Sequence, residues 1–300
     1  METKFMLIIL LIPLLTGCTG KVPVFNEENA YLMLQEQCDL GYRLPGSPEI
    51  ALCRDYITSK LQQYGAEVSL QNFTIEFEGN EYEGINITGH FYPELSRRVL
   101  LGAHYDTRPW SDKDEDVAKH EIPVTGANDG ASGVAVLLEL GKILSSNMPP
   151  EYGVDLVFFD LEDMGRYSEN DTWCLGSEYF AENYEGEKPE KAIVIDMIGD
   201  AALEVPIEYF SYHNSPALVR EIWDIAEELE IDAFKSRIDD AVYDDHYSLI
   251  KVGFNAIDII DFDYKWWHTI NDTPDKCSAA SLGKIGRVLT SFIYNNDVSD

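Results

Sequence analysis

Two apolar runs decide the fold: Val-Leu-Leu-Gly-Ala-His at residues 99–104 and Asp-Leu-Val-Phe-Phe-Asp-Leu at residues 155–161. Each has the length of a strand and is almost entirely apolar, as expected for a strand that is buried on both faces of a parallel sheet. Between them, residues 132–144 form a largely apolar run that is long enough to be a helix. The sequence therefore predicts a strand–helix–strand unit, the building block of α/β folds.

The same kind of pattern continues on both sides of this unit. Further strands are predicted at Glu67–Phe77, Gly84–Phe91, Ala192–Met197 and Ala256–Ile260, the first two as an antiparallel pair. Further helices are predicted at Asn26–Leu40, Glu49–Tyr64, Ser177–Tyr184, Pro216–Leu229 and Ala279–Tyr294. We therefore predict one domain over residues 19–300, with an α/β fold of three layers, α/β/α, around a central mixed, mostly parallel sheet.

The composition agrees with a packed globular domain and excludes one class of partner. Of the 300 residues 45% are hydrophobic, which is ample for a core. The formal net charge is -32, from 54 acidic and 22 basic residues. Such a chain repels phosphate backbones, so nucleic acid is not expected as a partner. An acidic surface suits substrates with a cationic amine, although most of these charges form a solvated face.

The N-terminus resembles a bacterial lipoprotein signal. Lys4 precedes an apolar run from Phe5 to Leu15, which is too short to span a bilayer, and Leu-Thr-Gly then leads directly to Cys18. We expect residues 1–18 to be a lipoprotein-type signal peptide ending in the lipobox, with a lipid anchor on Cys18. The protein would then be exported and membrane-anchored, in the periplasm or at the outer membrane. An ordinary signal peptide with an incidental cysteine is the alternative.

The other four cysteines leave their pairing open. Cys38, Cys53, Cys174 and Cys277 would lie in a compartment where disulfides persist, and four cysteines allow three complete pairings. Cys38 and Cys53 are close enough in sequence to connect the first two helices. Free buried thiols are an equal alternative.

Three short runs carry the residues of a metal site. Asp129 lies in Gly-Ala-Asn-Asp-Gly, Asp163 ends Phe-Phe-Asp-Leu-Glu-Asp, and His268 follows Trp267 in Trp-Trp-His-Thr. One nitrogen and two oxygen ligands are a set that binds a catalytic zinc while leaving a coordination position open. The sequence therefore predicts a zinc enzyme.

More acidic and histidine residues stand just beyond the predicted strands. Glu162 beside Asp163 would stay free as a general base or acid; an acidic pair at a helix start is the plainer explanation. His104 and Asp196 would either complete a second metal site or bind the ligands by hydrogen bonds, with Asp106 orienting His104. Because ligands bind at the carboxyl ends of strands in open α/β sheets, we expect these groups to converge. His90, His120 and His213 lack such company and are predicted to be structural or superficial.

Taken together, these runs resemble the zinc-dependent glutaminyl cyclases of the animal type and their bacterial relatives, which share a fold with the zinc aminopeptidases. The resemblance spans nearly the whole mature chain. It is carried by Arg43–Pro48, Ala103–Asp106, Gly126–Asp129, Phe158–Asp163, Asp196–Gly199, Asp244–His246 and Trp267–Thr269. It implies a zinc exopeptidase-like (phosphorylase/hydrolase-like) fold for the domain, which would be catalytic.

The resemblance assigns roles to individual residues. Asp129, Asp163 and His268 match the ligands of a single zinc, although a second metal is not excluded. Glu162 matches the catalytic proton shuttle. Asp196 and Asp244 match the acidic residues that form hydrogen bonds near this proton shuttle. Trp267 matches a tryptophan of the pocket wall.

Two positions depart from the animal pattern. Asp163 stands where animal enzymes carry Glu, which shortens the ligand by one methylene. Ser168 lies near the place of another pocket aromatic, so we expect that wall to come from Trp110 or Trp173.

The implied reaction is cyclisation of an N-terminal glutamine of peptides or proteins to pyroglutamate, with release of ammonia. The alternative is a zinc aminopeptidase with one or two metals, because His104 and Asp196 are present. An exported binding or scaffold lipoprotein that has lost catalysis is a third interpretation. Its signature would be a missing ligand or base, and the sequence lacks neither.

Overall fold

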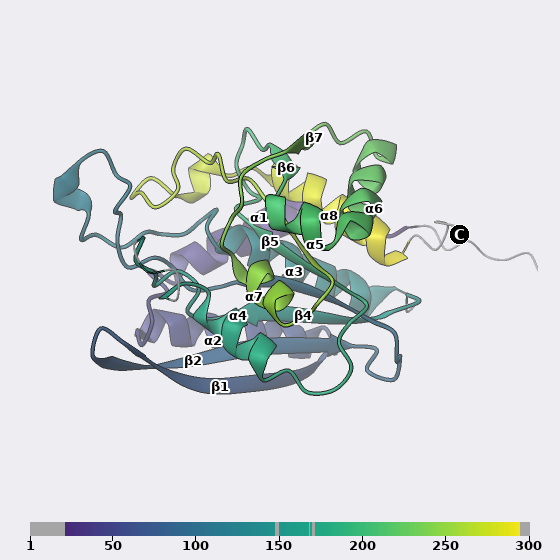
Figure 1. The fold of residues 1–300 in the computed structure, drawn as a ribbon, viewed down its shortest axis with the longest axis horizontal. Helices are drawn as coiled ribbons and strands as arrows, with labels where there is room; N and C mark the ends of the chain where they lie inside the picture. Colours follow the sequence, from purple (N-terminus) through teal and green to yellow (C-terminus); the bar gives the residue numbers. More distant parts are fainter. Residues whose placement is uncertain (1–21, 148–149, 168, 170–171, 295–300) are drawn as a thin grey trace, which may run out of the picture.

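The computed structural model describes residues 22–147, 150–167, 169 and 172–294. A six-stranded sheet runs through the molecule in the order β1-β2-β4-β3-β5-β8 (Figure 1). Its strands are β1 (Glu67–Phe77), β2 (Asn80–Phe91), β3 (Arg98–His104), β4 (Gly153–Phe159), β5 (Lys191–Asp196) and β8 (Ala256–Ile260). The predicted signal peptide and the Cys18 anchor lie outside the described residues and stay predictions.

The sheet is mixed and mostly parallel, as predicted. Strands β4, β3, β5 and β8 are parallel to one another. The hairpin of β1 and β2 joins this part through an antiparallel pairing of β2 with β4. All carboxyl ends of the parallel strands therefore meet at one edge, which is where residues from distant parts of the sequence can form a site.

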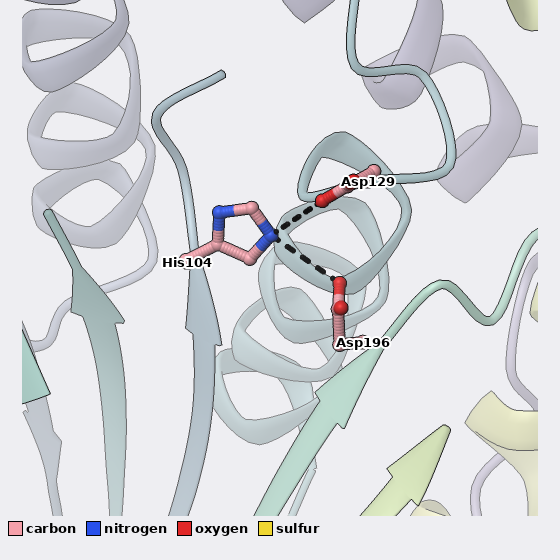
Figure 2. Close-up of side chains that lie close together, drawn as sticks. All are labelled: His104, Asp129 and Asp196. Atoms are coloured by element: carbon pink, nitrogen blue, oxygen red, sulfur yellow. Dashed lines mark ion pairs between the residues drawn. The ribbon is translucent and has the colours of Figure 1, made fainter. Parts of the chain in front are cut away.

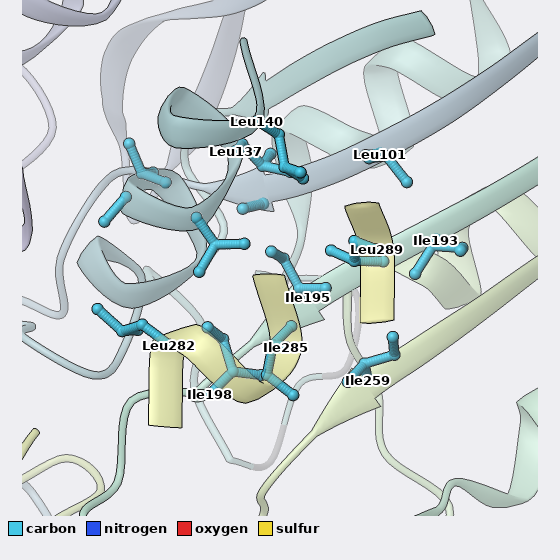
Figure 3. Packing of buried hydrophobic residues seen from close by; sticks show 14 of the residues in the cluster. Leu101, Leu137, Leu140, Ile193, Ile195, Ile198, Ile259, Leu282, Ile285 and Leu289 are labelled. Carbon is cyan, nitrogen blue, oxygen red and sulfur yellow. The ribbon is translucent and has the colours of Figure 1, made fainter. Parts of the chain in front are cut away.

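Helices cover both faces of the sheet, and the side chains of each strand alternate between them. Leu101 joins the larger apolar cluster, which it shares with α1 (Glu27–Asp39), α2 (Pro48–Gln63), α3 (Ala131–Ser146), α6 (Pro216–Glu228) and α8 (Ala279–Tyr294). Leu100 points to the opposite face and joins α4 (Leu175–Glu182) and α7 (Asp245–Lys251). Figure 3 shows the larger cluster, where Leu137 of α3 and Leu289 of α8 pack with Ile195 of β5. The α/β/α prediction is thus confirmed.

The structure contains short elements that the sequence analysis missed. A parallel pair, β6 (Val205–Ile207) and β7 (Phe234–Ile238), stands apart from the main sheet, and α5 (Tyr209–Asn214) and α7 were not anticipated. One-turn 3-10 helices occur at Val117–Lys119 and Pro274–Lys276. These elements are too short to show a hydrophobic period, so packing rather than pattern forms them.

Two further findings concern cysteines and membranes. Cys38, Cys53, Cys174 and Cys277 are all free thiols, so the first two helices are not joined by a disulfide. None of the helices in the described part of the chain is both long and apolar enough to cross a bilayer.

Gly133 lets α3 approach the strands that carry the site. A Cβ at this position would lie 2.6 Å from the carbonyl oxygen of Ile195 and 2.8 Å from the Cβ of Ala103. Both contacts are closer than van der Waals packing allows, and one of them is with backbone that cannot rotate away. The helix can therefore lie against β3 and β5 only because residue 133 has no side chain.

We predict that Gly133→Ala lowers the free energy of unfolding by about 1–3 kcal/mol, because overpacking outweighs the helix propensity gained. Gly141→Ala in the same helix is the control, since its added Cβ would meet only side-chain atoms at 3.3–3.4 Å. Urea unfolding of both variants measures the difference. Equal stability of the two variants would contradict the close approach at Gly133.

Candidate metal centre and cavity

The predicted site residues converge at the carboxyl edge of the sheet. His104 and Asp196 are the last residues of β3 and β5, and Glu162 and Asp163 follow β4. Asp129 lies just before α3, and His268 lies in the connection from β8 to α8. His90, His120 and His213 lie elsewhere: they contact Asp155, the carbonyl oxygen of Asp114 and the carbonyl oxygen of Tyr209, respectively.

Asp129, Asp163 and His268 form a compact buried group. His268 Nε2 lies 3.2 Å from Asp163 Oδ1 and 3.5 Å from Asp129 Oδ2. The Oδ2 atoms of both aspartates are buried and accept no hydrogen bond from the residues that the structure describes. Buried carboxylate oxygens without partners beside an imidazole nitrogen fit a zinc ion, which supplies the missing positive charge.

A second group shares Asp129 with the first. His104 Nε2 lies 3.1 Å from Asp129 Oδ1 and 3.3 Å from Asp196 Oδ1 (Figure 2). The two oxygens of Asp129 thus face two different histidines. A carboxylate in this position can bridge two metals, so the geometry of the carboxylates and imidazoles alone accommodates either one or two ions.

The two histidines differ in the charge that their surroundings favour. Burial lowers the pKa of His104, but hydrogen bonds that its ring donates to Asp106, Asp129 and Asp196 outweigh burial and raise this pKa well above its ordinary value. Burial lowers the pKa of His268, and the charge of Asp163 offsets this only in part. His268 is therefore favoured as the neutral imidazole, the form that binds metal, and His104 as a cation.

Other carboxylates hold the backbone of the site. The two oxygens of Asp106 accept the N–H groups of Glu162 and Asp163, both at 3.1 Å. Asp106 also lies 3.4 Å from His104 Nδ1, which agrees with the orienting role predicted from sequence. Asp272 accepts the N–H of Asp129 at 3.2 Å. Two carboxylates outside both groups thus hold the backbone of Asp129, Asp163 and Glu162 in place.

Arg108 and Tyr167 were missed by the sequence analysis. The fully buried Arg108 donates from Nη1 to the carbonyl oxygen and to Oδ1 of Asp163, at 3.1 and 3.0 Å. The Tyr167 hydroxyl lies 2.5 Å from Nδ1 of His268. This contact fixes the orientation of the imidazole ring, in which Nε2 points towards Asp129 and Asp163. Tyr167 could have been found from the sequence, because the resemblance places a pocket aromatic near Ser168, the next residue along the chain. Ser168 itself lies outside the described residues.

The backbone is strained at three places beside these residues. Leu161, Met197 and His268 have φ values of 55°, 48° and 55°, in the left-handed region that side chains other than glycine seldom adopt. Each lies at the point where a functional side chain must turn out of its strand or loop. Strain of this kind persists where the surrounding packing enforces it, which is typical of functional sites.

A cavity of about 180 Å³ opens over Asp129, Glu162 and His268. Trp267, Trp173 and Tyr167 form its aromatic wall, and the ring of Trp173 is parallel to that of His268 at 5.9 Å. Of the two candidate tryptophans, Trp173 is therefore the one that lines the cavity. Trp110 is not among the residues that line the cavity; its ring contacts Arg166, whose guanidinium carbon lies 3.6 Å from the ring centroid.

The relatives of this chain have the same architecture. The model of peptidase family M28 matches residues 86–293. The chain belongs to peptidase family M28. Its fold is that of the zinc exopeptidases and glutaminyl cyclases, which confirms the resemblance found in the sequence.

Three relatives illustrate the range within the family. The glutaminyl cyclase of Bacteroides thetaiotaomicron bound to N-acetylhistamine is 34% identical, with a TM-score of 0.89 over 92% of this chain and 100% of the other. A leucine aminopeptidase precursor from the same organism is also 34% identical, with a TM-score of 0.90 over 92% and 99%. Glutaminyl-peptide cyclotransferase of Bos taurus is 22% identical over 84% of this chain and 77% of its own length. Against the first two curated relatives that it matches, the chain spans about half their length, 52% and 56%.

Glu162 faces the cavity of this M28 protein as a buried acid. Burial raises its pKa well above the ordinary value; the charge of His104 opposes this rise, and the charge of Asp163 adds to it. The Cys174 thiol donates to Oε1 at 3.3 Å. A carboxyl group whose pKa is displaced upwards in a cavity is suited to exchange protons with a substrate amine.

A buried network supports the far side of the cavity. Asp244, which lines the cavity, lies in one group with His246 and Asp258, and His246 Nδ1 is 3.3 Å from Asp258 Oδ2. His246 Nε2 is 3.0 Å from Oε2 of Glu208. Glu208 also accepts the N–H groups of Ser211 and Val242. This carboxylate therefore connects α5, the segment before Asp244 and α7.

The acid sensitivity of the fold should depend on Glu208. Burial opposes its ionisation, but His246 and the backbone N–H groups outweigh burial and lower its pKa from 4.5 to about 2. A lowered pKa in the folded state means that its stabilisation is complete above the ordinary pKa and is lost as pH falls towards about 2.

We predict that Glu208→Gln lowers the free energy of unfolding by about 3 kcal/mol at neutral pH, and that this difference shrinks between about pH 5 and pH 2. Urea unfolding at a series of pH values measures it. Glu178→Gln, which removes a partly exposed pair with Lys251, is the control and should change little. A difference that is the same at neutral and acidic pH would contradict the prediction.

Proposed function

We propose that this M28 protein is a zinc-dependent glutaminyl cyclase, which converts the N-terminal glutamine of peptides or proteins to pyroglutamate and releases ammonia. The observation that carries the proposal is the cavity: its aromatic wall of Tyr167, Trp173 and Trp267 closes directly over the group of Asp129, Asp163 and His268. A cavity of about 180 Å³ holds one small side chain with little room for more. Full-length similarity to a bacterial glutaminyl cyclase supports the same conclusion.

Asp129, Asp163 and His268 would hold one zinc ion. When bound, zinc supplies a Lewis acid for the oxygen of the γ-carboxamide. The orphaned oxygens of Asp129 and Asp163 and the neutral imidazole of His268 fit this ion.

The protein's own residues would move the proton and place the reacting atoms. Glu162 would take a proton from the attacking α-amine and deliver it to the departing nitrogen. Asp196 and Asp244 also line the cavity and offer acceptors for the amine and carboxamide N–H groups. Because amine and carboxamide belong to one residue, holding the correct rotamer between the aromatic rings supplies much of the rate through effective molarity.

The second candidate is a zinc aminopeptidase, which must activate a water molecule. It is favoured by the position of Asp129 between two histidines and by the similarity to a leucine aminopeptidase precursor. Mass spectrometry of a Gln-initiated peptide after incubation with the zinc-loaded protein separates the two. We expect a product lighter by one ammonia with the peptide otherwise intact. Release of glutamine and a shortened peptide would instead establish the aminopeptidase.

Two substitutions test the assigned roles. We predict that Glu162→Gln retains zinc but loses about 10²-fold or more in kcat, because no group remains to transfer the proton. His268→Ala should lose both zinc and turnover. Zinc content by atomic emission and turnover by ammonia release are the measurements, with the exposed Glu78→Gln as control. Near-normal turnover of zinc-replete Glu162→Gln would rule out the proton transfer.

A further inference from the structure

Several exposed aromatic side chains of this protein lie in the cavity wall or connect to it through ring contacts. Within the described ranges, six tyrosine and phenylalanine residues are exposed: Tyr42, Tyr167, Tyr209, Tyr212, Tyr243 and Phe262, at 40–49%. Tyr167, Tyr243 and Phe262 line the cavity itself. Exposed apolar groups that are scattered singly need no explanation, but a contiguous group marks an interaction site.

Ring contacts extend this surface from Tyr243 onto α5. The ring centroids of Tyr243 and Phe210 are 5.8 Å apart, and those of Phe210 and Tyr209 are 5.9 Å apart. The ring of His213 packs against that of Tyr209 at 4.1 Å in a tilted arrangement and contacts Tyr212 at 5.2 Å. We call Tyr209, Phe210, Tyr212, His213 and Tyr243 the aromatic rim. Its rings form one series of contacts that begins at Tyr243 in the cavity wall and runs along α5 to Tyr212.

The rim is held firmly although its outer face is exposed. Glu208 caps α5 by accepting the N–H groups of Phe210 and Ser211, and the Tyr209 N–H donates to the carbonyl oxygen of Asp240. Tyr247 of α7 packs against Phe210 at 4.3 Å. Rings fixed in this way lose little conformational entropy when a ligand covers them, as in the aromatic anchors of protein interfaces.

The occupant can be argued from the size of the cavity. Its volume suits the first side chain of a substrate, so the rest of a peptide must leave through the mouth. Tyr243, which lines the cavity and is 49% exposed, connects it to the rest of the rim through Phe210. The net charge of -32 repels anionic lipid and nucleic acid. It does not repel an uncharged apolar peptide segment.

We propose that the aromatic rim binds the residues that follow the N-terminal residue of the substrate, and that it selects peptides or proteins with apolar side chains at those positions. This inference rests on the proposed function and specifies its substrate class. Tyr209 and Tyr212 are specificity-determining residues on this surface, outside the groups that carry the chemistry.

The test compares Gln-Gly, the polar peptide Gln-Ser-Ser-Ser-Lys amide and the apolar peptide Gln-Phe-Leu-Phe-Lys amide. We expect the zinc-loaded protein to prefer the apolar over the polar peptide by about tenfold in kcat/KM, mainly through KM. Tyr209→Ser combined with Tyr212→Ser should abolish this preference and leave Gln-Gly turnover unchanged. Tyr42→Ser removes an equally exposed ring away from the cavity and should retain the preference.

Several outcomes would overturn the proposal. Equal turnover of the two longer peptides by the unmodified protein would do so, as would a preference that survives the double substitution. If the double variant keeps the peptide preference but no longer binds phosphatidylcholine vesicles, the rim binds lipid instead. If it keeps the preference but loses a dimer seen in sedimentation velocity, the rim binds a second copy of the chain.

Failure of the proposed function is recognised separately. If no Gln-initiated peptide reacts, the proposed cyclase function is wrong. Binding of the fluorescently labelled apolar peptide then tests whether the rim is a peptide-binding surface. Weaker binding to the double variant than to Tyr42→Ser would support the docking surface, and equal binding would overturn it.

Discussion

A single buried carboxylate, Asp129, fixes the relation between the two halves of the site. Its Oδ1 faces His104 at the end of β3, and its Oδ2 faces His268 in the loop after β8. Burial and the charges of Asp163 and Asp196 raise the pKa of Asp129 well above its ordinary value, and contact with His104 opposes this rise. The end of a central strand, the start of α3 and a loop near the C-terminus thus meet at this one side chain.

The remaining acidic residues of the site are kept in place by backbone amides and by buried arginines. Asp106 and Asp272 accept N–H groups of the segments that carry the ligands. Arg108 and Arg43 are fully buried, and each donates to carbonyl oxygens of those same segments. An unpaired carboxylate or guanidinium would be costly at this depth, but these groups make several hydrogen bonds each. The acidity of the chain is thus a structural feature of its interior as well as of its surface.

How much the sequence revealed depended on how local each signal was. Strands β3 and β5 and helix α3 have long apolar runs, and the residues just beyond the strands were identified as site residues because parallel strands end at one edge. Tyr167 and Arg108 belong to irregular segments without a period, and they reach the site only through tertiary packing. The sequence left Trp110 and Trp173 as alternatives for the same reason: neither lies in a helix or strand, and only the fold shows that Trp173 lines the cavity. Short elements such as α5 and β6 were missed because three to six residues cannot show a repeat.

The same edge of the sheet can serve hydrolysis or cyclisation, and the difference lies in what shares the cavity with the metal ligands. Hydrolysis needs room for water beside the scissile bond, held in a position to attack. Cyclisation needs the opposite: the nucleophile is already part of the substrate, so the protein has to restrict its rotamers and exclude water. The rings of Trp173 and Trp267 lie 5.9 and 4.0 Å from the ring of His268. They therefore restrict the space next to the metal ligands. Under the proposed function, the aromatic wall, more than the identity of the ligands, is the feature of this M28 protein that would favour an intramolecular reaction.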